Sequence, residues 1–200
     1  MVVLAHKLQS KVNLFYRYGL KAFYACPKLA DVIDRTLIDL LTYRNVPLAD
    51  IWKDRVRGSS QLRHYHALDD ATLVGMNADL YPVLARWFNK GKDTNALGAY
   101  FVNFGKARQI QGFPVSEVLY SLVLAEKVVV EGMMSEGSLE SSIQMYQAVD
   151  ATMRISEFFL LGSFYLTKGF LEETYLHLNT TESVPEELLK RYFRDDFFFK

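Results

Sequence analysis

Apolar residues recur every three or four positions along most of this chain, the spacing that gathers side chains on one face of an α-helix. The first such stripe consists of Leu4, Leu8, Val12 and Phe15. No segment alternates apolar and polar residues as a half-buried strand does, and neither Asn-Gly nor Asp-Gly marks a β-hairpin. The pattern therefore predicts an all-α fold.

Prolines and a helix-capping residue place the boundaries in the first half of the chain. Pro27 separates the first helix from the second, and Pro47 opens a short third helix. A further helical turn is expected over residues 61–66. Asp69 is suited to cap the next helix, which Pro82 should kink.

The sequence QGFPVSEVLYSL, residues 111–122, interrupts two helical patterns with a Gly and a Pro. Gly112 should end the first of these helices, and Pro114 should open the second, which runs to about Gly137. We expect the two helices to form an antiparallel hairpin around which the rest of the bundle is built.

The helical pattern then continues from Ser138 to about Leu178, a straight length of about 60 Å. Because an unbroken rod would be that long, we expect a kink or break near Gly162 or Gly169. A capping box at residues 183–186 predicts one more short helix near the end of the chain.

Together these segments predict a multi-helix bundle of about seven to nine helices in a single domain. Its expected parts are N-terminal helices over 1–67, a core bundle over 68–180, and a short C-terminal helix and tail over 181–200.

The charge balance limits the partners that can be expected. Lys plus Arg and Asp plus Glu each number 23, so the formal net charge is zero and gives no electrostatic support for binding nucleic acid. Cys26 is the single cysteine, which excludes an intramolecular disulfide. The longest apolar run, residues 158–166, is far shorter than the roughly 20 residues that span a bilayer. We expect a soluble, cytoplasmic protein.

Arg108 and Glu126 each fall within an apolar helix face of the predicted hairpin. They are expected about 6 Å and about 20 Å from the corner, so they should not pair with each other. Arg108 is level instead with Glu117, in the first turn of the following helix. This arrangement indicates either an ion pair that clamps the corner or an anion or ligand site at Arg108. Glu126 has no partner that the sequence identifies, and lies either at a helix boundary or in a functional site.

The run FFLLGSFYL is apolar on every side of its helix, so that helix is either enclosed by the bundle or pressed against a second copy of the chain. Phe158, Phe159, Phe164 and Tyr165 accordingly belong to the core, to a homodimer interface or to an apolar ligand pocket. Three aromatic residues near the C-terminus form a candidate docking segment for a partner protein: Phe197, Phe198 and Phe199.

No cofactor or metal is expected. His64 and His66 fall on different sides of a helix, which argues against a shared metal even with Asp69 and Asp70 nearby. Haem would need an axial ligand, and no histidine lies between His66 and His177. The sequence also has no phosphate-binding glycine loop, nucleophile elbow or zinc-ligand spacing, so we do not expect an enzyme.

The corner carries a Gly-x-x-Arg followed by Gly, an apolar residue, Pro, an apolar residue, Ser and Glu. These residues are Gly105, Arg108, Gly112, Phe113, Pro114, Val115, Ser116 and Glu117. The pattern resembles the helical N-terminal sensor domain of the RsbRD type, the RsbT co-antagonist family, found ahead of histidine-kinase, STAS and related output modules. The similarity extends over about residues 68–173. No such output module follows here, so the resemblance implies action in trans on a histidine-kinase, STAS or anti-sigma type partner, or a stand-alone input module.

The expected function is a non-catalytic regulatory or sensory module for signal transduction. It is expected to be a homodimer that changes its helix packing when it binds a partner or a small ligand. One alternative is an enzyme or apolar-ligand carrier that uses the aromatic centre of the bundle, with Glu126 or Arg108 as its polar group. Another is a structural adaptor whose Phe-rich tail recruits a protein.

Overall fold

The computed structural model describes residues 27–89, 91–136, 141–181, 184–185 and 187–189, so the first predicted helix lies outside the described residues. The described residues form eight helices and no strand, which confirms the predicted all-α fold. The helices are α2 (Pro27–Tyr43), α3 (Asn45–Arg57), α4 (Arg63–His66), α5 (Asp70–Ala78), α6 (Leu80–Asn89), α7 (Thr94–Ile110), α8 (Val115–Glu136) and α9 (Ser142–Thr181).

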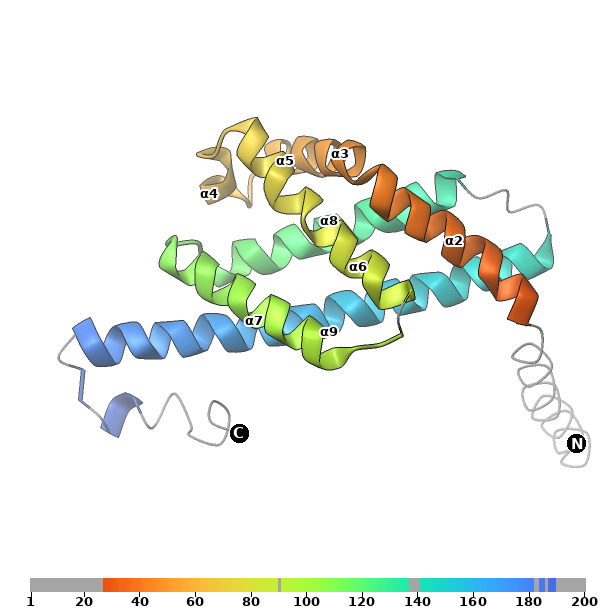
Figure 1. The fold of residues 1–200 in the computed structure, drawn as a ribbon. Coiled ribbons are helices and arrows are strands. Elements are labelled where there is room, and N and C mark those ends of the chain that lie inside the picture. The colour runs from red at the N-terminus through yellow and green to blue at the C-terminus, as the bar shows by residue number, and fades with distance from the viewer. Residues whose placement is uncertain (1–26, 90, 137–140, 182–183, 186, 190–200) are drawn as a thin grey trace, which may run out of the picture.

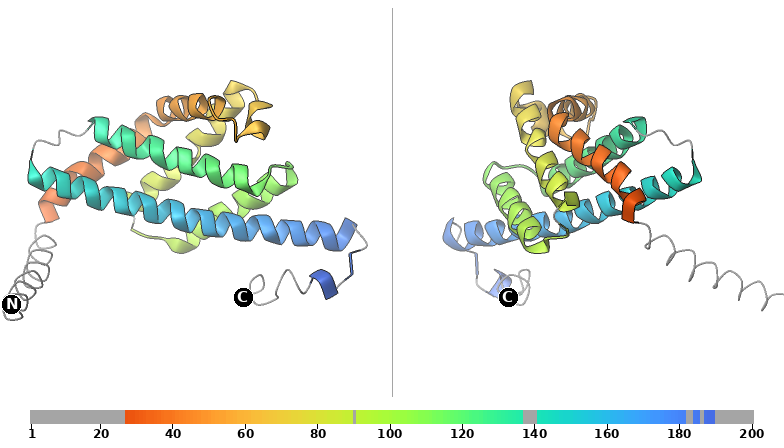
Figure 2. Two further views of the ribbon diagram at one scale, coloured as in Figure 1. Left: turned by 180° about the vertical axis from the view of Figure 1, so that it is seen from behind. Right: turned by 45° about the vertical axis from the view of Figure 1, so that its right-hand side comes forward.

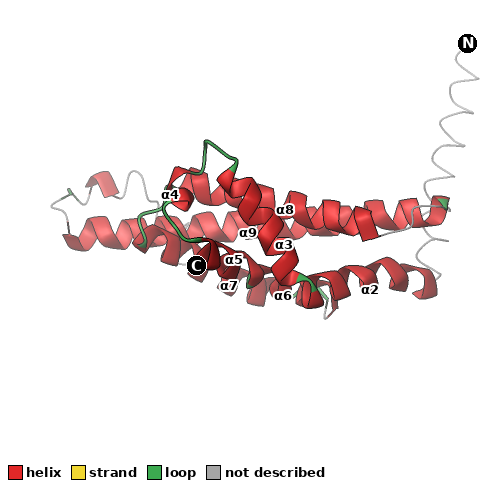
Figure 3. Ribbon diagram, turned by 90° about the horizontal axis from the view of Figure 1, so that it is seen from above, coloured by secondary structure: helices red, strands yellow, loops and turns green. Residues whose placement is uncertain are grey.

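The long helix α9 runs through the whole length of the bundle (Figure 1). α8 lies beside α9 on one side of the molecule, whereas α2, α6 and α7 lie on the other side (Figures 2 and 3). α3, α4 and α5 form a small group that packs against α8 through α3. None of the described helices is both long and apolar enough to cross a bilayer.

The apolar side chains that the described helices bury form one cluster. Its aromatic part joins elements that are distant in the sequence. The ring centroids of Phe101 and Phe158 are 5.5 Å apart, and those of Trp87 and Phe158 are 6.0 Å apart. Tyr65 and Tyr81 are also completely or almost completely buried. This cluster ties α4, α6, α7 and α9 into one bundle.

The break predicted near Gly162 or Gly169 is wrong, because α9 is one uninterrupted helix of 40 residues. The glycines serve close packing against α7. A Cβ atom on Gly169 would lie 2.1 Å from the backbone oxygen of Val102, and one on Gly105 would lie 2.1 Å from that of Leu166. The two helices therefore touch backbone to backbone, and only residues without a side chain fit at these points.

The predicted helix after Asp69 is divided in two at Asp79, one turn before Pro82, which has no N–H to donate to the Ala78 carbonyl. α5 ends at Ala78 and α6 begins at Leu80, which makes Pro82 the third residue of α6. In the first turn of a helix the missing N–H of proline has no intrahelical partner to lose. The predicted cap is confirmed, because Asp69 Oδ1 accepts a hydrogen bond of 2.8 Å from the backbone N–H of Thr72.

The corner between α7 and α8 follows the prediction. Gly112 has a left-handed φ of 77°, its N–H donates to the Gln109 carbonyl at 2.9 Å, and the N–H of Phe113 donates to the Arg108 carbonyl at 3.0 Å. This pair of bonds is the Schellman motif that ends a helix at glycine. α8 then starts directly after Pro114. The two helices form the predicted hairpin, and α7 makes its most extensive contact with α9.

Candidate functional site

Arg108 is a buried cation at the end of α7, with 7% of its surface exposed. Its Nη1 donates to Gln111 Oε1 at 2.6 Å. The guanidinium carbon lies 4.7 Å from the ring centroid of Phe104 and 5.4 Å from that of Phe113, which are favourable cation–π distances. Nε is buried and has no hydrogen-bond partner. Burial lowers the pKa of Arg108, because the low-dielectric surroundings disfavour its charge.

Glu117, which was predicted to pair with Arg108, has different partners. Its Oε2 accepts from the backbone N–H of His64 at 2.9 Å, and its Oε1 lies 2.8 Å from His64 Nδ1. The carboxylate therefore joins α4 to the first turn of α8, where the helix dipole favours negative charge. Two separate sets of contacts hold the corner. Glu117 of α8 contacts His64 of α4, and Arg108 of α7 contacts the ring of Phe113. The projection from sequence missed this because it does not place α4 beside the corner.

A cavity of about 10 Å³ lies next to Arg108 and is lined by residues of α3, α4, α5, α6, α7 and α8. Most of its wall is aromatic or aliphatic, and it also contains polar or amphipathic side chains: Trp52, Tyr65, Asn77, Arg108 and Ser121. Two buried polar atoms of this wall have no hydrogen-bond partner, Arg108 Nε and Asn77 Oδ1. Buried polar atoms normally have hydrogen-bond partners, so a small group bound in this cavity would be stabilised by bonding to these two atoms.

Tyr65 also lines the cavity, and hydrogen bonds determine the acceptor to which its hydroxyl donates its proton. Ser121 Oγ donates to the Val118 carbonyl at 2.7 Å, so in its 3.0 Å contact with Tyr65 it accepts the phenol proton. Burial raises the pKa of Tyr65, and burial also raises that of Tyr100 to about 12. Both phenols therefore stay neutral, and neither supplies a counter-ion for Arg108.

Glu126 is not part of this cavity. It is partly buried between α8 and α9, where its Oε1 accepts a hydrogen bond of 2.6 Å from Ser156 Oγ. The structure thus gives Glu126 the partner that the sequence did not identify. Glu126 and Arg108 do not come together, in agreement with the levels expected along the hairpin.

The predicted aromatic set divides between the two sides of α9. Phe158 and Phe159 are buried in the core, whereas Phe164 is 51% exposed. Tyr165 is partly buried and packs against Gly98 of α7, where an added Cβ would lie 3.1 Å from the tyrosine ring. The pair Phe158 and Phe159 therefore belongs to the core, and Phe164 belongs to a surface.

That surface is an exposed apolar stripe along α9. The exposed fraction is 62% for Tyr146, 67% for Met153 and 71% for Leu160. Leu160 and Phe164 stand two residues before and after Gly162, which places them about 160° around the helix from the contact with α7. We call the stripe and its neighbours on α8 the outer face: Val123, Met134, Met145, Tyr146, Val149, Met153, Leu160 and Phe164, all more than a third exposed.

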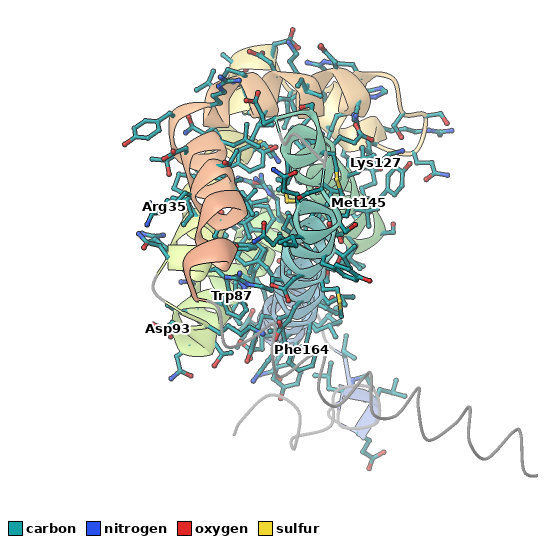
Figure 4. The ribbon with its side chains drawn as sticks, turned by 90° about the vertical axis from the view of Figure 1, so that its right-hand side faces the viewer. Arg35, Trp87, Asp93, Lys127, Met145 and Phe164 are labelled. Carbon is teal, nitrogen blue, oxygen red and sulfur yellow. The ribbon has the colours of Figure 1, made fainter. Side chains whose placement is uncertain are left out.

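The figures show that the described helices leave this face uncovered. Seen from behind, α8 and α9 run side by side with no described helix in front of them (Figure 2). Lys127 of α8 and Met145 of α9 lie on the same side, away from Arg35 of α2 (Figure 4). Val123 and Met134 are about one and two helical turns from Lys127, so they face the same way.

His64, His66, Asp69 and Asp70 do not converge. His66 Nε2 contacts the Val56 carbonyl at 2.9 Å, and Asp70 pairs with an arginine of α3 at 2.7 Å. Within the part of the chain that the structure describes, no group of three or more His, Cys, Asp or Glu is placed to hold a metal ion. The candidate docking residues Phe197, Phe198 and Phe199 lie outside the described residues.

Comparisons of the chain with protein families, with curated proteins and with solved structures find no match. The resemblance to RsbRD-type sensor domains therefore stays a prediction.

Sequence reasoning found Arg108 but missed Asn77, Tyr65 and Ser121 as its neighbours, because no local pattern places α4 and α5 beside the corner. The outer face had a signal in the sequence. Tyr146, Val149, Met153, Leu160 and Phe164 recur at helical spacing, and the run around Gly162 is apolar on all sides.

Proposed function

We propose that this protein is a non-catalytic regulatory module that acts as a homodimer through the outer face. The single observation that carries the proposal is the exposed apolar stripe on α9, opposite the face that packs against α7. Scattered exposed apolar residues are normal on a protein surface, but apolar residues that recur along one face of a helix are typical of an interaction site.

The area supports a stable interface. The large apolar side chains of the outer face are 37% to 71% exposed. At about 100 Å² each, they offer roughly 800 Å² in total. That is about the area that each partner contributes to an interface of standard size.

A second copy is the occupant that the pattern favours, because the stripe can pair with itself. When two α9 helices pack antiparallel around a twofold axis near residue 155, Tyr146 lies opposite Phe164 of the second copy. Val149 then lies opposite Leu160 of that copy. Such an isologous arrangement buries the same residues on both chains, as most soluble homo-oligomers do.

The packing of α9 supplies a route for regulation. Gly162 contacts α7 on one side of the helix, while Leu160 and Phe164 project from the other. A shift of α7 against α9 therefore moves the outer face. The titratable side chains considered for chemistry, Glu117 and Glu126, are engaged in contacts between helices. These contacts support a role in packing rather than in catalysis.

The proposal is tested by the mass of the assembly in solution. Sedimentation equilibrium should give two chains for the wild type and one chain for Met153→Glu or Leu160→Glu, because a dimer would bury the new carboxylates. Ile51→Glu is the matched control, since Ile51 is 46% exposed on α3, outside the outer face, and this variant should remain a dimer. A monomeric wild type, or a dimer that survives both outer-face substitutions, would refute the proposal.

A further inference from the structure

We propose that the cavity beside Arg108 binds one small inorganic monoanion of halide size, held by the guanidinium of Arg108 and the amide of Asn77. The proposal does not depend on the homodimer, because the cavity and the outer face share no residue.

The first argument is charge. The guanidinium of Arg108 is buried, and among the described residues no Asp or Glu forms an ion pair with it. Glu117, the carboxylate that the sequence suggested as its partner, is bonded to His64 through both of its oxygens. The two phenylalanine rings and the amide oxygen of Gln111 offset only part of the cost of removing a charged group from water.

The second argument is that two unused hydrogen-bonding groups belong to the wall of the same cavity. Arg108 Nε–H has no acceptor, and Asn77 Oδ1 has no donor, although both are buried in the wall of one cavity. The two ends of an Asn side-chain amide are nearly indistinguishable in shape, so a half-turn presents Nδ2 in place of Oδ1. The wall then carries two N–H donors without an acceptor, and an anion between them would satisfy both donors and the positive charge.

Tyr65 and Trp52 do not compete for this role. The Tyr65 hydroxyl gives its proton to Ser121, and Trp52 Nε1 donates to the Ser121 carbonyl at 2.9 Å. Both donors are therefore already used, whereas Arg108 Nε and Asn77 Oδ1 have no partner within the protein. The neutral Tyr100 phenol also lines the cavity and can add a third donor.

Size selects the class of anion. A cavity of about 10 Å³ accepts one atom-sized occupant of the dimensions of a water molecule. Chloride and bromide are single atoms somewhat wider than a water molecule and are the smallest common anions that could enter with a slight adjustment of the wall, whereas sulfate, phosphate and gluconate are several atoms across and too large. A water molecule is the competing occupant, because it can accept from Arg108 Nε and donate to Asn77 Oδ1 without turning the amide.

The experiment compares thermal melts in bromide and in gluconate at equal ionic strength. If bromide is present at about ten times its dissociation constant, it should raise the melting temperature of the wild type by about 3–6 °C relative to gluconate. Arg108→Gln and Asn77→Leu should each abolish this difference. Arg154→Gln is the control and should keep it, because Arg154 already pairs with Asp34 at 2.7 Å.

Crystals of the wild type grown in bromide provide a second measurement that does not require a folded Arg108 variant. An anomalous peak within hydrogen-bond distance of Arg108 Nε would support the proposal. Electron density for a water without anomalous signal would overturn it. Equal melting temperatures in bromide and gluconate for the wild type would overturn it as well.

Discussion

Replacing Gly169 by Ala should destabilise the protein, although alanine is the better helix former. The new Cβ would lie 2.1 Å from the backbone oxygen of Val102 and 2.8 Å from the carbonyl carbon and Cα of the same residue. A clashing side chain can rotate away, but these are backbone atoms of α7. The two helices must therefore move apart, and the packing on both sides of the contact loosens.

The expected magnitude follows from two opposing effects. Alanine in a helix interior is favoured over glycine by about 1 kcal/mol. Overpacking costs about 1–3 kcal/mol, and a backbone contact belongs at the upper end of that range. The net loss in unfolding free energy should be about 2 kcal/mol, which for a chain of this size lowers the melting temperature by about 4–8 °C.

Urea denaturation followed by far-UV circular dichroism measures the effect, with Gly75→Ala as the matched control. Gly75 lies inside α5, and a Cβ built on it meets no atom within 4 Å. The same chemical change there should stabilise the protein by up to about 1 kcal/mol. A Gly169→Ala variant as stable as the wild type would refute the close contact between α7 and α9.

Three further outcomes are expected. Asp69→Ala should lower the melting temperature, and the difference from wild type should shrink below pH 3.8, because hydrogen bonds from Thr72 hold the pKa of Asp69 below that ordinary value. Burial raises the pKa of Tyr100 to about 12, so between pH 10 and about 12 this phenol ionises only in the unfolded chain and the unfolding free energy falls as the pH rises. Tyr100→Phe should make this fall smaller in thermal melts recorded across that pH range. Trp52→Phe should cost about 1–2 kcal/mol in urea denaturation, because it removes the buried bond to the Ser121 carbonyl.

The features predictable from the sequence are those that depend on near neighbours. α7 ends just before Gly112, where the N–H of Gly112 bonds to Gln109, three positions back, and the N–H of Phe113 bonds to Arg108, five positions back. Asp69 caps α5 through Thr72, three positions along the chain. Such short-range chemistry is carried by residue type and spacing alone.

The failures all depend on distant parts of the chain. Gly162 and Gly169 look like helix breakers until α7, about 60 residues earlier, is placed against them. Glu117 is paired with His64, which is 53 positions away. The position of Arg108 in an apolar helix face indicated a special residue, but much of the cavity wall beside it comes from α3, α4, α5, α6 and α8. A single sequence does not specify which of several apolar faces meet.

The continuity of α9 makes it a rigid lever. A helix of 40 residues is about 60 Å long, and the contact with α7 lies toward its middle and C-terminal part. A tilt of about 5° around the centre displaces each end by about 3 Å, more than the clearance of a well-packed contact. A tilt too small to break any hydrogen bond at the glycine contact therefore displaces the ends of α9 by a larger distance. A protein bound near either end would then pack against α9 differently.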